Sequence, residues 1–384
     1  MIGWIITVVP IWVGHAVLWT WQLNNLYGRK INKRFLRIWR LLTGIVILFG
    51  IPALAWLILP TEIEPTHFQS IVTPPVAVYF SVCQLFGLVV FPLVTVWRFT
   101  RPAPRSLISQ KTETIDYWKE LGPSIGGRGK WWWMVRLPFT CAFKVDFTEI
   151  VLTLPNLPKA WDGLTILHLS DFHFHGTPTR SFFERIFRDV MSRWPTNDLV
   201  VMTGDYIDTD DLVTWIKPLL EDFEATDVKL AILGNHDEKH QPDDVRLALQ
   251  SAGYRVISNH WDVVTIRGES CAVVGHEGPW FRPPPGPCPT PDLPKLCLMH
   301  SPDNIYWAAR EGCQLAFAGH VHGGQVRLPV IGPIFVPSIY SRRFDSGVFD
   351  VNGTTLVISR GLSGKEPLRF RCNPQIVRVT LRVG

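Results

Sequence analysis

Three long runs of apolar residues occupy the first hundred positions of the chain, and none of them contains a charged side chain. They cover residues 1–21, 41–60 and 75–97. Each is close to the ~20 apolar residues that a helix needs to cross the hydrocarbon core of a bilayer. The pattern predicts a transmembrane region at 1–97 with three spanning helices, in preference to three buried helices of a water-soluble protein.

The charges between these runs predict their orientation. Glu62 and Glu64 lie between the second and third runs, with no Lys or Arg beside them. Basic residues without acidic neighbours separate the first two runs and follow the third: Arg29, Lys30, Lys33, Arg34, Arg37, Arg40, Arg98, Arg101, Arg105 and Lys111. Such loops stay on the cytoplasmic side. We therefore expect an integral protein of the cytoplasmic membrane, with an outward N-terminus and a cytoplasmic catalytic domain. Seven scattered cysteines without a CxxC spacing fit free thiols in a reducing compartment.

The next segment, 98–142, is rich in proline, glycine and basic residues, and we expect it to be a linker. It contains Lys130, three consecutive tryptophans at 131–133, and Arg136. Aromatic rings beside cations are typical of the membrane–water interface. The alternative is that the tryptophans pack on the following domain, and the sequence leaves both interpretations open.

From residue 143 to 384 short apolar runs alternate with amphipathic segments. Residues 164–171, 198–205 and 228–237 have the pattern of buried strands, and residues 181–194, 212–223 and 243–252 that of helices. This alternation is typical of an α/β fold with parallel strands. Residues 262–276 and 346–361 have the pattern of hairpins. We therefore expect one α/β domain at 143–384 that includes a mixed second sheet.

Polar residues follow five of these apolar runs directly, where the strands of such a fold place functional loops. They are Asp171, His173, Asp205, Asn235, His236, His300, His320 and His322. Any one of them could be a core or turn residue, but five such blocks together predict a metal centre. Mixed carboxylate and imidazole ligands favour Mn, Fe or Zn over Ca or Mg. Seven ligands out of these eight residues suit two divalent ions, which can clamp a phosphate and lower the pKa of a water between them.

The blocks DFH, GDYID, GNHD, His300 and GHVH resemble, in this order, the calcineurin-like metallophosphoesterase superfamily. SRGLSG at 359–364 and HSPD at 300–303 are similar to its small membrane-associated bacterial branch. The resemblance implies a layered sandwich of two mixed β-sheets flanked by helices. It also implies two sets of metal ligands bridged by Asp205: Asp171, His173 and His322 for one ion, and Asn235, His300 and His320 for the other. It further implies that His236 contacts the phosphate and protonates the leaving oxygen, and that Asp208 orients His236.

These features together predict hydrolysis of a phosphodiester or pyrophosphate bond at a membrane. The expected substrate is a lipid or lipid-linked nucleotide such as UDP-diacylglucosamine, because some relatives in the resembled branch are similar to enzymes that cleave this lipid. Thr209 and Asp210 stand where protein Ser/Thr phosphatases continue with Arg-Gly, which argues against phosphoprotein substrates. The alternatives are a general phosphodiesterase for soluble substrates and a non-catalytic membrane sensor that binds a phosphorylated ligand. The net charge is +5, but no basic stripe with interleaved aromatics occurs in the soluble domain, so nucleic acid is not an expected partner.

Overall fold

The computed structural model describes residues 2–58, 74–129 and 131–384. The chain divides into two compact units, and each is described by itself. The helical unit comprises Met1–Pro102 with Pro329–Ile331, and the sheet unit comprises Ala103–Leu328 with Gly332–Gly384. Glu62, Glu64 and Lys130, which entered the predictions above, lie outside the described residues.

The helical unit is built from α1 (Ile2–Tyr27), α2 (Lys33–Ile58), α4 (Pro74–Leu85), a π-helical turn (Phe86–Val90) and α5 (Phe91–Thr100). The last three form one continuous helix. Glycines let α1 approach this helix closely: a Cβ on Gly14 would lie 1.7 Å from the carbonyl oxygen of Cys83. Backbone contact through small residues is typical of helices that pack in membranes.

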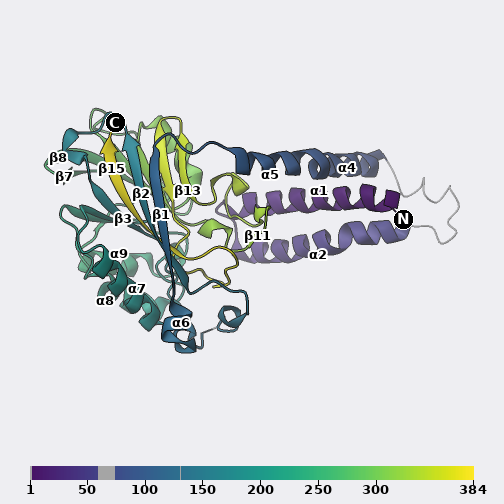
Figure 1. Ribbon diagram of the computed structural model, residues 1–384, viewed down its shortest axis with the longest axis horizontal. Helices are drawn as coiled ribbons and strands as arrows, with labels where there is room; N and C mark the ends of the chain where they lie inside the picture. The colour runs from purple at the N-terminus through teal and green to yellow at the C-terminus, as the bar shows by residue number, and fades with distance from the viewer. Residues whose placement is uncertain (1, 59–73, 130) are drawn as a thin grey trace. The chain divides into compact units, whose positions relative to one another are not determined.

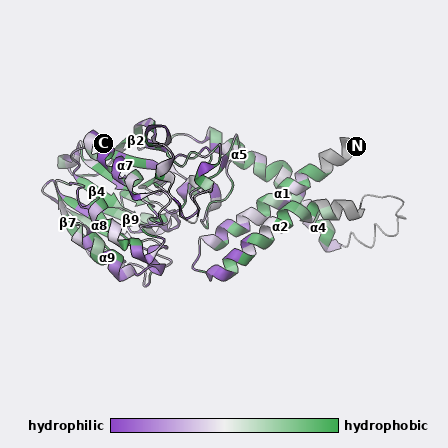
Figure 2. Cartoon of the chain, turned by 90° about the horizontal axis from the view of Figure 1, so that it is seen from below, coloured by the Kyte–Doolittle hydropathy of each residue, from purple (hydrophilic) through white to green (hydrophobic). Residues whose placement is uncertain are grey.

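Among the described residues, one helix is long and apolar enough to cross a membrane, the 27-residue helix Pro74–Thr100. Only 6% of its most apolar stretch is buried, whereas the core helix of a soluble protein would be mostly buried. Hydrophobic residues also cover much of α1 and α2 (Figure 2). The expected spans at 1–21 and 41–60 fall within these helices, apart from Met1 and residues 59–60, which are not described. The structure thus supports one of the three expected spans, and the other two stay predictions.

Two mixed sheets form the body of the sheet unit. The first has the order β1-β2-β15-β3-β4-β5-β6 and the second the order β13-β14-β10-β9-β8-β7. The strands of the first are β1 (Leu107–Asp116), β2 (Lys144–Leu154), β15 (Gln375–Val383), β3 (Thr165–Leu169), β4 (Leu199–Met202), β5 (Val228–Ala231) and β6 (Arg255–Val256). Those of the second are β13 (Gly347–Val351), β14 (Thr354–Ile358), β10 (Leu315–Ala318), β9 (Lys295–Met299), β8 (Glu269–His276) and β7 (Trp261–Ile266). A separate short pair joins β11 (Arg327–Leu328) to β12 (Gly332–Pro333).

Alternate residues of each strand point into different cores, which makes the unit layered. On β4, Leu199 and Val201 pack between the two sheets, whereas Val200 and Met202 pack under the helices. These helices are α7 (Arg180–Arg193), α8 (Ile216–Leu220) and α9 (Pro242–Ser251), which gather on one side of the unit (Figure 1). The short α10 (Ile305–Arg310) packs in a third core with the second sheet. The expected sandwich of two mixed sheets flanked by helices is therefore present, with β7–β8 and β13–β14 as antiparallel pairs.

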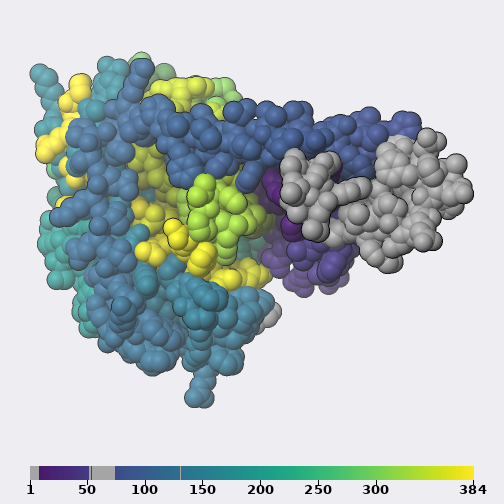
Figure 3. Space-filling view, turned by 45° about the vertical axis from the view of Figure 1, so that its right-hand side comes forward, coloured from purple at the N-terminus to yellow at the C-terminus, as the bar shows by residue number. Residues whose placement is uncertain are grey.

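The segment 98–142 differs from the expected linker. Residues 107–116 form the edge strand β1, which pairs antiparallel with β2 over nearly its whole length. The helix α6 (Tyr117–Leu121) follows, and its Tyr117 is fully buried in the core. In Figure 3 the blue chain that follows the helical unit covers one face of the sheet unit. The sheet unit thus begins about forty residues earlier than the expected boundary at residue 143.

Candidate metal centre

The predicted ligands meet beyond the ends of five strands. In the first sheet β3, β4 and β5 run parallel, and in the second β9 and β10 run parallel. Parallel strands present their carboxyl ends at one edge, where α/β proteins place their functional loops. The loops after these strands bring Asp171, Asp205, Asn235, His300 and His320 together there.

Five predicted ligands hold the backbone in the left-handed region. Their φ angles are 55° for Asp171, 47° for His173, 60° for Asp205, 68° for His320 and 50° for His322. Each such conformation costs on the order of 1–3 kcal/mol for a residue other than glycine, and clusters of such residues are typical of functional sites. The sharp turns aim consecutive side chains at one point rather than continuing the strand. The strain is thus concentrated where the sequence predicts chemistry.

Two glycines give the loops room to approach one another. A Cβ on Gly234 would lie 2.2 Å from Oδ1 of Asp205, and a Cβ on Gly319 would lie 2.0 Å from Oγ of Ser170. No real Cβ tolerates such contacts, so these positions require glycine. The close approach places GNHD and GHVH directly against the two carboxylates.

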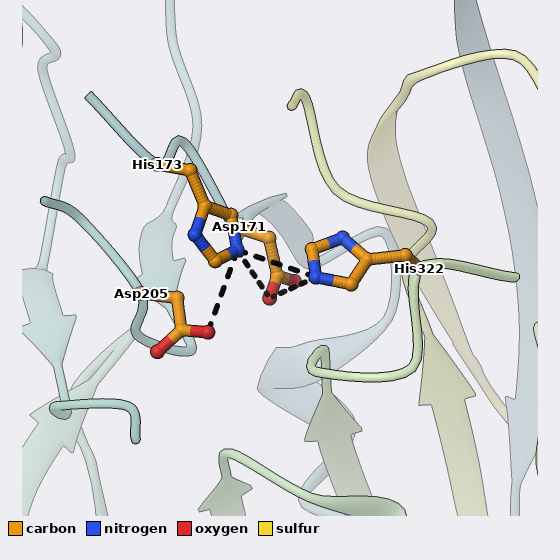
Figure 4. A group of neighbouring side chains, drawn as sticks. All are labelled: Asp171, His173, Asp205 and His322. Carbon is orange, nitrogen blue, oxygen red and sulfur yellow. Dashed lines mark hydrogen bonds and ion pairs between the residues drawn. The ribbon is translucent and has the colours of Figure 1, made fainter. Parts of the chain in front are cut away.

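The first cluster contains Asp171, His173, Asp205 and His322, whose side chains point towards one another (Figure 4). Nε2 of His173 lies 3.2 Å from Nε2 of His322 and 3.4 Å from Oδ2 of Asp205. Oδ1 of Asp171 lies 4.0 Å from Nε2 of His173 and 3.8 Å from Nε2 of His322. Ligands about 2.0–2.2 Å from a tetrahedral ion are separated by roughly 3.4 Å. The four atoms therefore have the spacing of a coordination shell.

The second cluster contains Asp205, His300 and His320, and Asn235 adjoins it. Nε2 of His300 lies 3.4 Å from Oδ1 of Asp205 and 3.0 Å from Oδ1 of Asn235. Nδ1 of His300 lies 2.7 Å from the carbonyl oxygen of Thr203, which fixes the ring with Nε2 facing the cluster. Asp205 thus turns one carboxylate oxygen towards each cluster, which is one of the ways in which a carboxylate can bridge two ions.

The chemistry of this donor set fits divalent cations. Nε2 of His320 is buried and has no hydrogen-bond partner among the described residues. A metal ion could accept the lone pair of this nitrogen. Burial alone would lower the pKa of His173 and of His300, but the facing carboxylates raise both to about 9. The same negative field attracts a cation. Carboxylates, imidazoles and one amide oxygen together suit Mn, Fe or Zn.

His236 and Asp208 lie beside the first cluster. Nδ1 of His236 contacts Oδ1 of Asp208, and Nδ1 of His173 lies 3.1 Å from Oδ2 of the same carboxylate. Burial would raise the pKa of Asp208, but the neighbouring imidazoles hold it well below its usual range. The sequence led us to expect only the contact with His236. Asp208 in fact joins a metal-ligand candidate to the proposed proton donor.

Asp237 is a structural residue that the sequence analysis did not single out. Its buried carboxylate accepts hydrogen bonds from the backbone N–H groups of Asp205, Tyr206, Ile207 and Gly234, at 2.8–3.3 Å. It therefore joins the loop after β4 to the loop after β5. The sequence did contain an indication of this role, because Asp237 directly follows His236 in GNHD. A carboxylate at that position can accept hydrogen bonds from the N–H groups of two turns.

Arg369 is a second residue that the sequence analysis missed. Its guanidinium is almost fully buried, and Nη2 donates to the carbonyl oxygens of Arg360 at 2.8 Å and Ser363 at 2.5 Å. The N–H groups of Leu362 and Ser363 in turn donate to the carbonyl oxygen of Asp171, at 3.2 and 2.9 Å. Arg369 thus fixes the loop against which Asp171 rests. The sequence alone does not distinguish the buried Arg369 from the neighbouring Arg371, which is exposed.

Several arginines that could have faced a phosphate are engaged elsewhere. Arg327 pairs with Asp345 at 2.9 Å, Arg360 pairs with Asp146 at 2.5 Å, and Arg343 lies over the rings of Tyr306 and Phe344. These three side chains are therefore held by partners within the protein.

Comparison with known proteins agrees with this geometry. Residues 164–324 match the family model described as calcineurin-like phosphoesterase. An uncharacterized metallophosphoesterase of Bacillus subtilis, YkuE, is 29% identical over 254 residues, which cover 62% of this chain and 86% of the relative. The phosphodiesterase YaeI of Escherichia coli is 28% identical over 56% of this chain and 81% of its own. The UDP-2,3-diacylglucosamine pyrophosphatase LpxG of Chlamydia muridarum is 25% identical over 60% of this chain and 88% of its own.

The fold, the clustered ligands and this match define the class of the protein. The chain carries a calcineurin-like metallophosphoesterase domain, as its sequence motifs predicted. It is a metal-dependent phosphoester hydrolase with bacterial relatives that include a phosphodiesterase and a pyrophosphatase.

Proposed function

We propose that the protein is a membrane-anchored phosphoesterase that uses two divalent ions to hydrolyse a phosphodiester or pyrophosphate bond. One observation carries the two-ion proposal: Asp205 lies between two clusters and turns a different oxygen towards each, 3.4 Å from His173 and 3.4 Å from His300. A single ion would leave one of these clusters without a cation to bind.

Each ligand then has a role. Asp171, His173 and His322 would hold one ion, Asn235, His300 and His320 would hold the other, and Asp205 would bridge them. Two divalent ions, of Mn, Fe or Zn, would polarise the phosphoryl oxygens and lower the pKa of a water that attacks phosphorus. The remaining groups of the chain orient the substrate and move protons.

His236 is the residue to which we assign proton transfer. Its Nδ1 is held by Asp208, so Nε2 is the nitrogen that can donate to a phosphoryl or leaving oxygen. A carboxylate on one imidazole nitrogen fixes the orientation of the ring. Burial lowers the pKa of His236, and the facing Asp208 carboxylate opposes this shift. The side chain of His236 is 16% exposed, so it can reach a ligand at the edge of the clusters.

The substrate we propose is a lipid or a lipid-linked nucleotide, such as UDP-diacylglucosamine. The helix Pro74–Thr100 supports this, because a membrane anchor keeps the metal centre where lipids are abundant. The chlamydial relative is named for the hydrolysis of UDP-2,3-diacylglucosamine. We further propose that α1 and α2 also span the cytoplasmic membrane, and that the sheet unit lies on its cytoplasmic side, following the basic residues that flank the spans.

A comparison of substrates tests this proposal. The full chain in detergent micelles is supplied with Mn, Fe, Zn or Mg and assayed on UDP-2,3-diacylglucosamine, on bis-p-nitrophenyl phosphate and on a phosphomonoester. We expect a kcat/KM for the lipid pyrophosphate that exceeds the other two by orders of magnitude. Equal values would overturn the lipid assignment but leave the phosphoesterase in place.

A second candidate is a general phosphodiesterase for soluble substrates. The name of the E. coli relative, which is 28% identical, favours it. Its signature is a bis-p-nitrophenyl phosphate rate that does not depend on whether the chain sits in micelles or in bilayers.

A further inference from the structure

The loop after α6 presents large aromatic side chains to solvent. Trp132 and Trp133 are 46% and 47% exposed, and Phe139 is 66% exposed. The guanidinium of Arg136 lies 4.7 Å from the centre of the Trp132 ring. We call residues 131–139, together with Arg128 and Gly129, the aromatic loop. In Figure 1 the blue chain beyond α6 extends away from the sheets.

The aromatic loop is folded, so its exposed rings do not result from an unstructured segment. The backbone N–H groups of Trp132, Met134 and Arg136 donate to the carbonyls three residues earlier, at 2.9–3.2 Å. Val135 is 1% exposed and belongs to the same core as Ile125. This turn buries Val135 and directs Trp132 and Trp133 outward, against the alternative that both pack on the domain. A fixed cluster of exposed aromatics marks an interaction surface.

The aromatic loop is tied at one end to a segment that carries a proposed ligand, and at the other to a residue beside Arg369. At its start, the N–H of Gly129 donates to Oγ1 of Thr177 at 3.1 Å, and Thr177 lies four residues after His173. Four residues span at most about 14 Å. At its end, Phe139 packs on Phe370 with ring centres 6.4 Å apart, next to the buried Arg369. One end of the loop is therefore anchored within about 14 Å of a proposed metal ligand.

The charge of the aromatic loop and its flanking residues indicates which kind of partner the loop binds. Between Glu120 and Asp146 the chain has the basic residues Arg128, Lys130, Arg136 and Lys144, and no acidic residue. Tryptophan beside Lys and Arg is the composition that settles at the head-group level of an anionic bilayer. The head-group layer is only about 5–8 Å thick on each side. A loop seated in this layer would hold its anchor Thr177 near the membrane surface, with His173 no more than about 14 Å along the chain from that anchor.

We propose that the aromatic loop docks on the head groups of an anionic lipid bilayer and presents the metal centre to phosphates at the membrane surface. The inference rests on the proposed lipid substrate. It adds a second membrane contact, made by the phosphoesterase domain itself rather than by the helical unit. Trp132, Trp133 and Phe139 enter the interface, and Arg136 pairs with lipid phosphate.

Hydrogen exchange of the full chain in nanodiscs tests this docking. The amides of 131–140 are compared in discs of phosphatidylglycerol with phosphatidylcholine and in discs of phosphatidylcholine alone. We expect exchange in this segment to be about tenfold slower in the anionic discs. Arg136→Glu should abolish most of that difference, and so should the double change Trp132→Ser with Trp133→Ser. Exchange that is the same in both kinds of disc would overturn the proposal and favour a protein partner for the loop.

Two controls separate this proposal from the proposed function. Leu247→Ser alters an exposed apolar residue of α9, 62% exposed, and should leave exchange of the aromatic loop unchanged. Hydrolysis of UDP-2,3-diacylglucosamine in detergent micelles by the same protein variants reports the metal centre without a bilayer. Lack of turnover with normal lipid-dependent exchange would sink the proposed function alone. Normal turnover without lipid-dependent exchange would sink the docking alone.

Discussion

The two ends of the same strands carry polar clusters of opposite kinds. At the amino ends of β3 and β4, Asp198 accepts from the N–H and hydroxyl of Thr165, at 2.7 and 2.8 Å. Arg267 makes five hydrogen bonds there: two to the Asp198 carboxylate and three to the carbonyls of Ala160, Asp162 and Gly163. A guanidinium has five N–H donors, so each has a partner. This cluster is complete within the protein.

In the cluster at the carboxyl ends of these strands, by contrast, not every polar atom has a partner within the protein. His320 keeps a buried nitrogen without a partner among the described residues, and two histidines face each other at 3.2 Å. Five of its residues have a strained backbone. A cluster that satisfies itself stabilises the fold, whereas one that remains unsatisfied is built to receive a ligand. We therefore expect changes at the carboxyl ends to act mainly on activity and changes at the amino ends to act mainly on stability.

The largest expected effect is that of Asp205→Asn. Loss of the bridging charge should reduce turnover by on the order of 10³-fold, since metal ions contribute several kcal/mol to transition-state stabilisation. Burial would raise the pKa of Asp205, but the facing His300 holds it well below its usual range, so the charged form contributes to stability and the thermal midpoint should fall. Initial rates, metal content and calorimetry measure these quantities. Asp210→Asn, on the same segment but exposed, is the matched control and should leave all three unchanged.

His236→Ala should separate proton transfer from metal binding. We expect turnover to fall by about 10²–10⁴-fold, which is the usual contribution of a general acid. Metal content should remain at the wild-type level, because His236 belongs to neither set of proposed ligands. His240→Ala alters an exposed histidine paired with Asp210 and serves as control. A His236 variant that loses its metal would contradict the assigned role.

Arg267→Met probes the opposite end of the strands. It leaves the Asp198 carboxylate, whose side chain is 12% exposed, without its cation, and should cost about 2 kcal/mol of unfolding free energy. The phosphoesterase rate of the folded protein should be unchanged. Arg255→Met removes a more exposed pair with Asp262 and should cost less. Urea unfolding measures both. An Arg267 variant with normal stability and reduced turnover would reverse the comparison.

The pH dependence of stability is the smallest effect. Burial would raise the pKa of Asp198, but Arg267 and the donors of Thr165 lower it below the usual value of 3.8. A lowered pKa contributes stability above pH 3.8, and this contribution is lost as pH falls through the lower folded-state value. Arg267→Met should therefore reduce the difference in stability between neutral and acidic pH. Unfolding curves between pH 7 and pH 3 measure it, and equal pH profiles would contradict the account.

The sequence predicted the elements whose structure depends on residues that are close together along the chain. Apolar runs that end in Asp, Asn or His located β3, β4, β5, β9 and β10 together with their loops. It did not predict β1, because all but the ends of that strand are exposed and its residues show no apolar alternation. Such a strand is held by its backbone pairing with β2, which only the fold reveals.

Contacts between residues far apart in the sequence were not predicted either. The segment predicted as a helix at 212–223 is in part a 3-10 helix, Asp210–Trp215, ahead of the short α8. Asp208 contacts His173 across 35 positions, and Arg369 acts through a loop that rests on Asp171. Residue type and spacing named the donors that converge, but not the groups that hold them in place.

Metal reconstitution tests the central claim most directly. The full chain, freed of metal by a chelator, is titrated with Mn²⁺ while bound metal and hydrolysis of bis-p-nitrophenyl phosphate are measured. The account predicts no turnover in the chelated protein, two ions bound per chain, and recovery that is complete only at the second equivalent. Full turnover in saturating chelator, or full recovery with one ion, would contradict the two-metal centre.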